Sequence, residues 1–140
     1  MARQITLDQA EAVIAACKQE AVSVGQPMNI AVVDDGGNLV AFAAMDDTKL
    51  IGEDISQKKA LTAVMFQMDT RDLVPLTQPG APIYGIEATT GGNLVIFGGG
   101  VLLRDTNGAI AGGVGVSAGT VDEDHQVAEA GRKAFSAADR

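Results

Sequence analysis

The sequence contains very little cysteine, histidine or aromatic side chain: one Cys, one His, no Trp, and aromatics at 4% of 140 residues. One cysteine cannot form an internal disulfide, and Cys17 with His125 cannot supply the four ligands of a structural zinc site. Cys17 lies on the apolar face of a predicted helix, so we interpret it as a small buried hydrophobe.

Positive charge is also scarce. Ten Lys and Arg stand against 18 Asp and Glu, which gives a net charge of −8. Scattered cations in an acidic chain release few counterions, so nucleic acid and anionic membranes are excluded as partners. No window has the roughly 18 consecutive apolar residues of a membrane helix, and the first ten residues contain no signal-peptide run. These absences predict a soluble, cytoplasmic protein with a single domain over residues 1–140.

Hydrophobic periodicity and turn residues predict the order of the elements. The predicted helices span residues 7–24, 50–68 and 120–137, and the predicted strands span 28–33, 39–45, 94–97, 101–104 and 109–117. Thr6 with Gln9, and Thr120 with Glu123, form capping-box patterns at two of the helix starts. Because the strands come in consecutive groups, we expect an α+β fold with a five-stranded, largely antiparallel sheet flanked by helices, as in a profilin-like α/β sandwich.

Glycine, by contrast, is abundant, at 17 residues, and clusters in the second half of the chain. In the predicted strand 109–117, Gly113 and Gly115 alternate with Val114 and Val116. One face of that strand therefore has almost no side chains, and a helix, a second chain or a flat ligand has to lie close against it.

The helix predicted at 50–68 has an unexpected lysine. Its apolar residues form one arc, and Lys58 falls near the middle of that arc while Lys59 falls at its margin. Asp54 precedes Lys58 by four residues, the favourable order for a helical ion pair. Lys58 is therefore either a lysine at the rim paired with Asp54, or an anchor for an anionic ligand. The apolar residues of the arc are Ile51, Ile55, Leu61, Met65, Phe66 and Met68.

The segment 69–93 is predicted to be mostly irregular. It holds three of the four prolines and the only tyrosine, Tyr84. Long irregular segments are often binding loops or lids, and the alternative is an ordered loop packed over a sheet edge or against another subunit.

Three catalytic patterns are rejected. Gly115–Gly119 matches the G-x-S-x-G elbow around Ser117, but only the last helix follows, which leaves no separate acid and histidine downstream. The same glycines lack the second strand of a dinucleotide-binding unit. His125 falls on the polar face of the last helix with Glu129, which predicts a solvated surface histidine.

Four segments together resemble the GlcG/HbpS-like haem-binding family, which includes the C-terminal domain of PduO-type proteins. They are NIAVVDDGGNLV (29–40), DISQKKALTA (54–63), LVIFGGG (94–100) and GVGVSAGT (113–120). The resemblance implies an antiparallel α/β domain, assembly into oligomers up to octamers, and haem binding in some members through a His on the first helix. Residues 7–24 lack that His and offer only Cys17, which argues against haem, with Tyr84 and Met28 as alternative ligands.

Three functions are compatible with these observations. The first is a small oligomeric binding protein for haem or another small cofactor or metabolite, accessory to a catabolic operon. The second is a cofactor-independent isomerase or lyase that acts on a small organic acid with Lys58 as acid or base. The third is an accessory subunit without a ligand. The predicted ligand-binding residues are Lys58, Tyr84, Gly99 and Ser117, and no catalytic or metal-binding residue is predicted.

Overall fold

The computed structural model describes residues 4–138. Its helices are α1 (Leu7–Val24), α2 (Ile51–Phe66), α3 (Thr70–Thr77) and α4 (Val121–Ala138), with a short 3-10 helix η1 (Ile86–Thr90). Its strands are β1 (Asn29–Asp34), β2 (Leu39–Ala44), β3 (Gly100–Arg104) and β4 (Ile110–Ser117).

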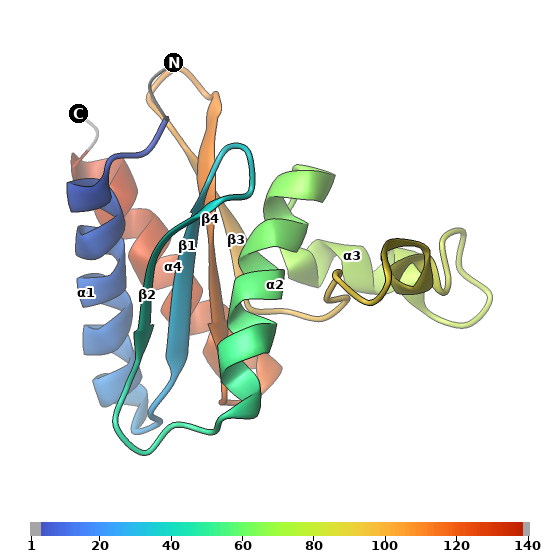
Figure 1. Ribbon diagram of the computed structural model, residues 1–140, viewed down its shortest axis with the longest axis horizontal. Coiled ribbons are helices and arrows are strands. Elements are labelled where there is room, and N and C mark those ends of the chain that lie inside the picture. The colour runs from blue at the N-terminus through green and yellow to red at the C-terminus, as the bar shows by residue number, and fades with distance from the viewer. Residues whose placement is uncertain (1–3, 139–140) are drawn as a thin grey trace.

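An antiparallel sheet in the order β2-β1-β4-β3 forms the middle layer of the molecule. Helices α1 and α4 lie side by side on one face, and α2 covers the other (Figure 1). Every residue of the central strand β1 is buried. The main apolar core lies on the α1–α4 side, where Ile30 and Val116 of the sheet join Val13 of α1 and Phe135 of α4.

The sheet has four strands, so the prediction of five was wrong. Residues 94–97, predicted as a strand, have no regular secondary structure and do not join the sheet. Leu94 and Val95 are nevertheless buried, and the Val95 N–H donates a hydrogen bond of 3.0 Å to Thr62 Oγ1 on α2. The run is apolar because it lies against α2, and a short apolar run does not by itself distinguish a strand from another buried segment. The α+β class is unchanged by this correction.

The bare face of β4 is covered by α2. A Cβ added to Gly115 would lie 2.0 Å from the carbonyl oxygen of Ser56, and one added to Gly113 would lie 2.8 Å from that of Ala60. Small residues of α2, among them Ser56 and Ala60, are buried against the strand. Of the three occupants expected for this face, the structure therefore shows the helix.

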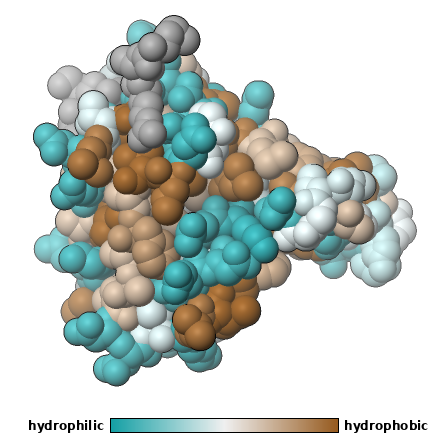
Figure 2. All heavy atoms as spheres, viewed as in Figure 1, coloured by the Kyte–Doolittle hydropathy of each residue, from teal (hydrophilic) through white to brown (hydrophobic). Residues whose placement is uncertain are grey.

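The large apolar residues of α2 lie outward rather than against the sheet. Ile51 and Met65 are 65% and 53% exposed, and Leu50, just before the helix, is 83% exposed. Only the small side chains of α2 fit against the glycines of β4. The larger apolar side chains of α2 therefore face outward. Figure 2 shows hydrophobic surface toward both ends of this helix, with a hydrophilic band between.

The segment predicted to be mostly irregular contains α3 and η1. Helix α3 packs near α2 and β3, whereas the part that carries Tyr84 and η1 projects from the body of the molecule (Figure 1). No residue of η1 is buried. The conformation of the projecting part therefore depends on its own turns more than on packing against the core.

Local signals at the helix starts and hairpin turns are confirmed. Gln9 N donates to Thr6 Oγ1 and Thr6 N donates to Gln9 Oε1, and Thr120 and Glu123 make the same reciprocal pair. Turns connect β1 to β2 at Asp35-Gly36 and β3 to β4 at Thr106-Asn107, between strands that the sequence predicts as neighbours. Across residues 4–138, no helix is both long and apolar enough to cross a membrane.

Candidate functional site

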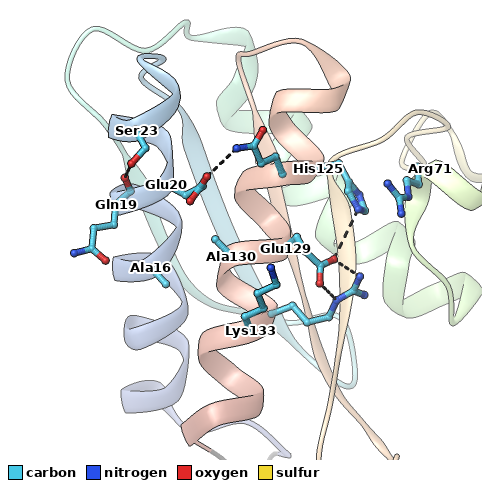
Figure 3. A pocket seen from close by; sticks show the side chains of 11 residues that line it. Ala16, Gln19, Glu20, Ser23, Arg71, His125, Glu129, Ala130 and Lys133 are labelled. Carbon is cyan, nitrogen blue, oxygen red and sulfur yellow. Dashed lines mark hydrogen bonds and ion pairs between the residues drawn. The ribbon is translucent and has the colours of Figure 1, made fainter.

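A groove of about 1010 Å³ lies between α1 and α4, beside the start of α3 (Figure 3). Its volume is at the upper end of the range of about 300–1,000 Å³ typical of small-molecule sites. Its lining includes Ala16, Gln19 and Glu20 of α1, Arg71 of α3, and His125, Glu129, Ala130 and Lys133 of α4.

Arg132 ties α4 to the start of α3 at one end of the groove. Its guanidinium donates two hydrogen bonds to the Asp69 carboxylate, at 2.8 and 2.9 Å, and two more to Glu129. Burial opposes the ionisation of Asp69, but the hydrogen bonds from Arg132 and from the Leu102 N–H outweigh it and lower its pKa. The charge of Arg132 is therefore already neutralised within the protein.

His125 is buried in the wall of the groove without a hydrogen bond, so the prediction of a solvated histidine was wrong. The residue is 8% exposed, and its Nδ1 has no partner among residues 4–138. Its Nε2 lies 3.8 Å from Glu129 Oε2, beyond hydrogen-bonding distance. Burial lowers the pKa of His125, and the nearby Arg71 guanidinium lowers it further. The ring is therefore neutral at pH 7.

Two cations of the groove have no counter-ion. Arg71 and Lys133 are both exposed, and within the described chain neither forms an ion pair. Figure 3 shows the Arg71 guanidinium beside the His125 ring and Lys133 on the same helix as Glu129. The groove therefore presents free positive charge in a chain whose net charge is −8.

A buried ion pair joins α2 to the start of α4. Lys59 Nζ lies 2.7 Å from Asp124 Oδ2 and donates a second hydrogen bond, of 2.8 Å, to the Val116 carbonyl. The Phe97 ring lies over the ammonium, with its centroid at 5.1 Å. Burial lowers the pKa of Lys59 and raises that of Asp124, while the attraction between the two charges opposes both shifts. Lys59 is fully buried, so the pair is closed to ligands.

The sequence pattern singled out Lys58, but the buried lysine is Lys59. Lys58 is half-buried and forms the predicted ion pair with Asp54, at 2.8 Å. The signal that identifies Lys59 is the stripe of small residues on α2, because Lys59 shares the buried face with Ser56 and Ala60.

The other predicted site residues occupy different surroundings. Gly99 and Ser117 lie near the same end of β4, because the Val116 N–H donates to the Gly99 carbonyl. A Cβ on Gly99 would lie 2.5 Å from Lys59 Nζ, and Ser117 is buried. Tyr84 is 61% exposed on the projecting segment. A ligand-binding role for Lys58, Tyr84, Gly99 and Ser117 stays a prediction.

Comparison with known proteins identifies the family. The family model described as "Haem degrading protein HbpS-like" matches residues 5–133. The chain belongs to the HbpS-like family. This confirms the resemblance inferred from the four sequence segments.

Relatives of this HbpS-like chain include bacterial proteins of similar length. An uncharacterized 15.0 kDa protein from the dhaT-dhaS intergenic region of Citrobacter freundii is 40% identical over 132 residues, which cover 94% of this chain and 92% of that protein. Protein GlcG of Escherichia coli K12 is 38% identical over 108 residues, 77% of each chain. The crystal structure of a PduOC–haem complex has a TM-score of 0.89 and 32% identity, covering 93% of this chain and 94% of that one.

The described part of this HbpS-like chain holds no group of three or more His, Cys, Asp or Glu side chains that could bind a metal ion. The charged and ionisable groups of the α1–α4 groove are instead one imidazole, the carboxylates of Glu20 and Glu129, and three cations. Such a set is suited to an anionic ligand, or to a metal whose other ligands come from an organic cofactor.

Proposed function

We propose that this protein binds haem, or a small anionic cofactor or metabolite of similar chemistry, in the α1–α4 groove. The observation that carries the proposal is the unpaired Arg71 and Lys133 beside a groove of about 1010 Å³. Free cations at a pocket in an acidic chain are explained most simply by a ligand with carboxylates. The similarity to the PduOC–haem complex supports haem as that ligand.

The residues of the groove fit haem better than they fit a bare metal ion. Haem, when bound, supplies an iron atom that already has four porphyrin nitrogens, so a single protein side chain is enough to hold it. The groove has one such side chain, His125, and two cations that can hold carboxylates. Ala16 and Ala130 line the same groove and leave room between the larger side chains.

Titration of the purified protein with ferric haem tests the proposal. We expect a shifted Soret band and a fixed ratio of haem to chain at saturation. Binding that rises without saturation, with the spectrum of free haem, would overturn the haem assignment. Saturable binding of a small dicarboxylate instead of haem would support the broader class of anionic ligands.

We infer that the protein also assembles with copies of itself through the outer face of α2. Leu50 and Ile51 are exposed at the start of the helix and Met65 near its end, and exposed large apolar groups are typical of interfaces. Light scattering should give a mass of several chains, reduced by Ile51→Asp. The control is Val22→Asp on α1, which replaces an equally exposed residue on another face. A wild-type mass equal to one chain contradicts the inference.

The acid–base alternative with Lys58 gains no support from the geometry, because Asp54 holds that ammonium at the surface. It stays a prediction, as does the accessory role in a catabolic pathway.

A further inference from the structure

Strand β2 is an edge of the sheet, and its outer side is unpaired. In the order β2-β1-β4-β3, the two edges are β2 and β3. Residues at the start of α3 cap the edge of β3: the Leu102 N–H donates to Asp69, and the Gly100 N–H donates to Thr70. Within residues 4–138, by contrast, β2 has hydrogen bonds only to β1. Its outward N–H and C=O groups are therefore free to pair with another strand.

The side chains of β2 do not protect this edge. Exposed edge strands usually carry charges or proline, which discourage pairing with another chain. The residues of β2 are LVAFAA, without a charge or a proline. Leu39 is 47% exposed, and the four residues after it are half-buried at the border of the sheet. An apolar edge of this kind is typical of a strand that receives a second strand.

The ladder with β1 determines which residues of β2 direct their backbone outward. The Met45 N–H donates to the Met28 carbonyl just before the ladder begins, and the register continues without a shift as far as Phe42. Hydrogen-bonded and non-hydrogen-bonded pairs alternate along an antiparallel ladder, so Ala44 and Phe42 direct their N–H and C=O groups away from β1. Phe42 is near the middle of the free edge. A two-fold axis beside Phe42 therefore allows two copies of β2 to pair antiparallel.

The position of α1 fits the same axis. Helix α1 runs beside β2 in the same direction and packs on both β1 and β2 (Figure 1). A helix above these two strands stands about 5 Å from such an axis, because neighbouring strands are about 4.8 Å apart. The two-fold operation then places two α1 helices antiparallel and about 10 Å apart, which is the distance between directly packed helices.

The side of α1 that faces this edge is complementary to itself. A groove of about 400 Å³ between α1 and β2 is lined by Glu11, Ala15 and Lys18, but not by Val22. Glu11 and Lys18 are exposed, and neither forms an ion pair within the described chain. In an antiparallel pair of α1 helices, Glu11 of each copy is opposite Lys18 of the other, with the small Ala15 between them. Such reciprocal contacts are what an interface between identical chains requires.

We propose that β2 pairs antiparallel with β2 of a second copy of this chain, with Phe42 at the two-fold axis and Glu11 of each copy bound to Lys18 of the other. The two four-stranded sheets then form one continuous sheet. This interface is separate from the α2 face described under the proposed function. The two interfaces together build assemblies larger than a dimer.

The charge pair is tested in an Ile51→Asp background, which removes the α2 face from the measurement. Light scattering should give a mass of two chains for this background. Adding Lys18→Glu or Glu11→Lys should raise the dissociation constant of the dimer by at least about tenfold, because like charges then face each other. The exchange of both residues, Glu11→Lys with Lys18→Glu, should restore the dimer. Glu20→Lys is the matched control and should leave the mass unchanged, because Glu20 lines the α1–α4 groove instead.

A cysteine at the axis tests the register of the two strands. In Phe42→Cys, the two Cα atoms should lie about 5.5 Å apart, within the range that a disulfide spans, so mild oxidation should link the dimer. Leu39→Cys is the comparison, because three residues along each strand separate its two Cα atoms by about 20 Å. The native Cys17 is buried and does not compete.

The outcomes separate this inference from the α2 interface. A mass of one chain for the Ile51→Asp background would leave the edge of β2 to a strand of another protein and would overturn the inference. Failure of the charge exchange to restore the dimer, or cross-linking of Leu39→Cys in place of Phe42→Cys, would also overturn it. A mass of two chains for both the wild type and Ile51→Asp would contradict the α2 face alone and support the pairing of β2.

Discussion

Asp124 and His125 are consecutive residues of α4, and both are buried, but they belong to contrasting regions. The Asp124 carboxylate accepts hydrogen bonds from Lys59 Nζ and from the Gly119 N–H. The His125 ring accepts and donates none within residues 4–138. The Asp124 carboxylate, paired with Lys59 of α2, is therefore electrostatically satisfied, whereas the His125 ring, near Arg71 of α3, is not.

The contrast separates a part of α4 that stabilises the fold from a part of α4 that lines the groove of the proposed ligand. A buried charge is tolerated only when its partners are present, so the folded state needs Lys59 and Asp124 together. An unsatisfied polar group opposes folding, so the His125 ring contributes less to stability than the paired Asp124 carboxylate does.

Replacing Lys59 by Met should have the largest effect. The change leaves the Asp124 carboxylate buried without its cation, and breaking one partner of a buried pair costs roughly 3–5 kcal/mol. Urea unfolding should show this loss. The double variant Lys59→Met, Asp124→Leu should recover most of it, and Lys58→Met should change stability by less than about 1 kcal/mol, because Lys58 pairs at the surface. Similar losses of unfolding free energy for Lys58→Met and Lys59→Met would contradict the contrast between a surface lysine and a buried one.

Adding a methyl group at Gly115 should be the next most damaging change. Its Cβ would overlap the Ser56 carbonyl oxygen of α2, a backbone atom that cannot move alone. Overpacking of this kind costs about 1–3 kcal/mol. Gly131→Ala on α4 is the comparison, because its new Cβ meets the side chains of Cys17 and Val13, and alanine is favoured within a helix by about 1 kcal/mol. Thermal unfolding should show a clearly smaller loss for Gly131→Ala than for Gly115→Ala.

Replacing His125 by Leu should leave the fold as stable as the wild type, or more stable by about 1 kcal/mol, because it removes an unsatisfied buried nitrogen. Chemical unfolding in the absence of ligand measures this directly. A strong destabilisation would show that the ring contributes to the core, which would erase the difference between His125 and Asp124.

The smallest effect concerns the interface between α1 and α4. Because burial raises the pKa of Cys17 to about 12, a thiol reagent at pH 8 should leave the folded protein unmodified and should label it fully in denaturant. Rapid labelling of the folded protein would show that α1 separates from α4 in solution.

Much of the fold could be predicted from local sequence, because its signals are local. The capping boxes and hairpin turns act within a few residues, and the alternation of Gly113 and Gly115 marks a face that α2 then covers. The predicted fifth strand failed for a nonlocal reason. The Val95 N–H is satisfied by Thr62 of α2, and nothing near residue 95 in the sequence indicates that partner.

The candidate site was harder to predict than the fold. Periodicity placed His125 on the polar side of α4, and it is buried because residues at the start of α3, distant in sequence, lie against that side. Hydrophobicity pointed to Lys58, whereas the closeness of α2 to a glycine strand selected Lys59. Both differences come from contacts between elements, and the hydrophobic pattern of a single helix carries no information about such contacts.

The Arg132–Asp69 bridge has one more consequence. Asp69 leads into α3, whose Arg71 lines the groove, so a ligand that engages Arg71 and the bridge to Arg132 both hold α3 against α4. Two such attachments are thermodynamically coupled, and the coupling is reciprocal. If the proposed ligand engages Arg71, weakening the bridge lowers its affinity by the same factor by which the ligand strengthens the bridge.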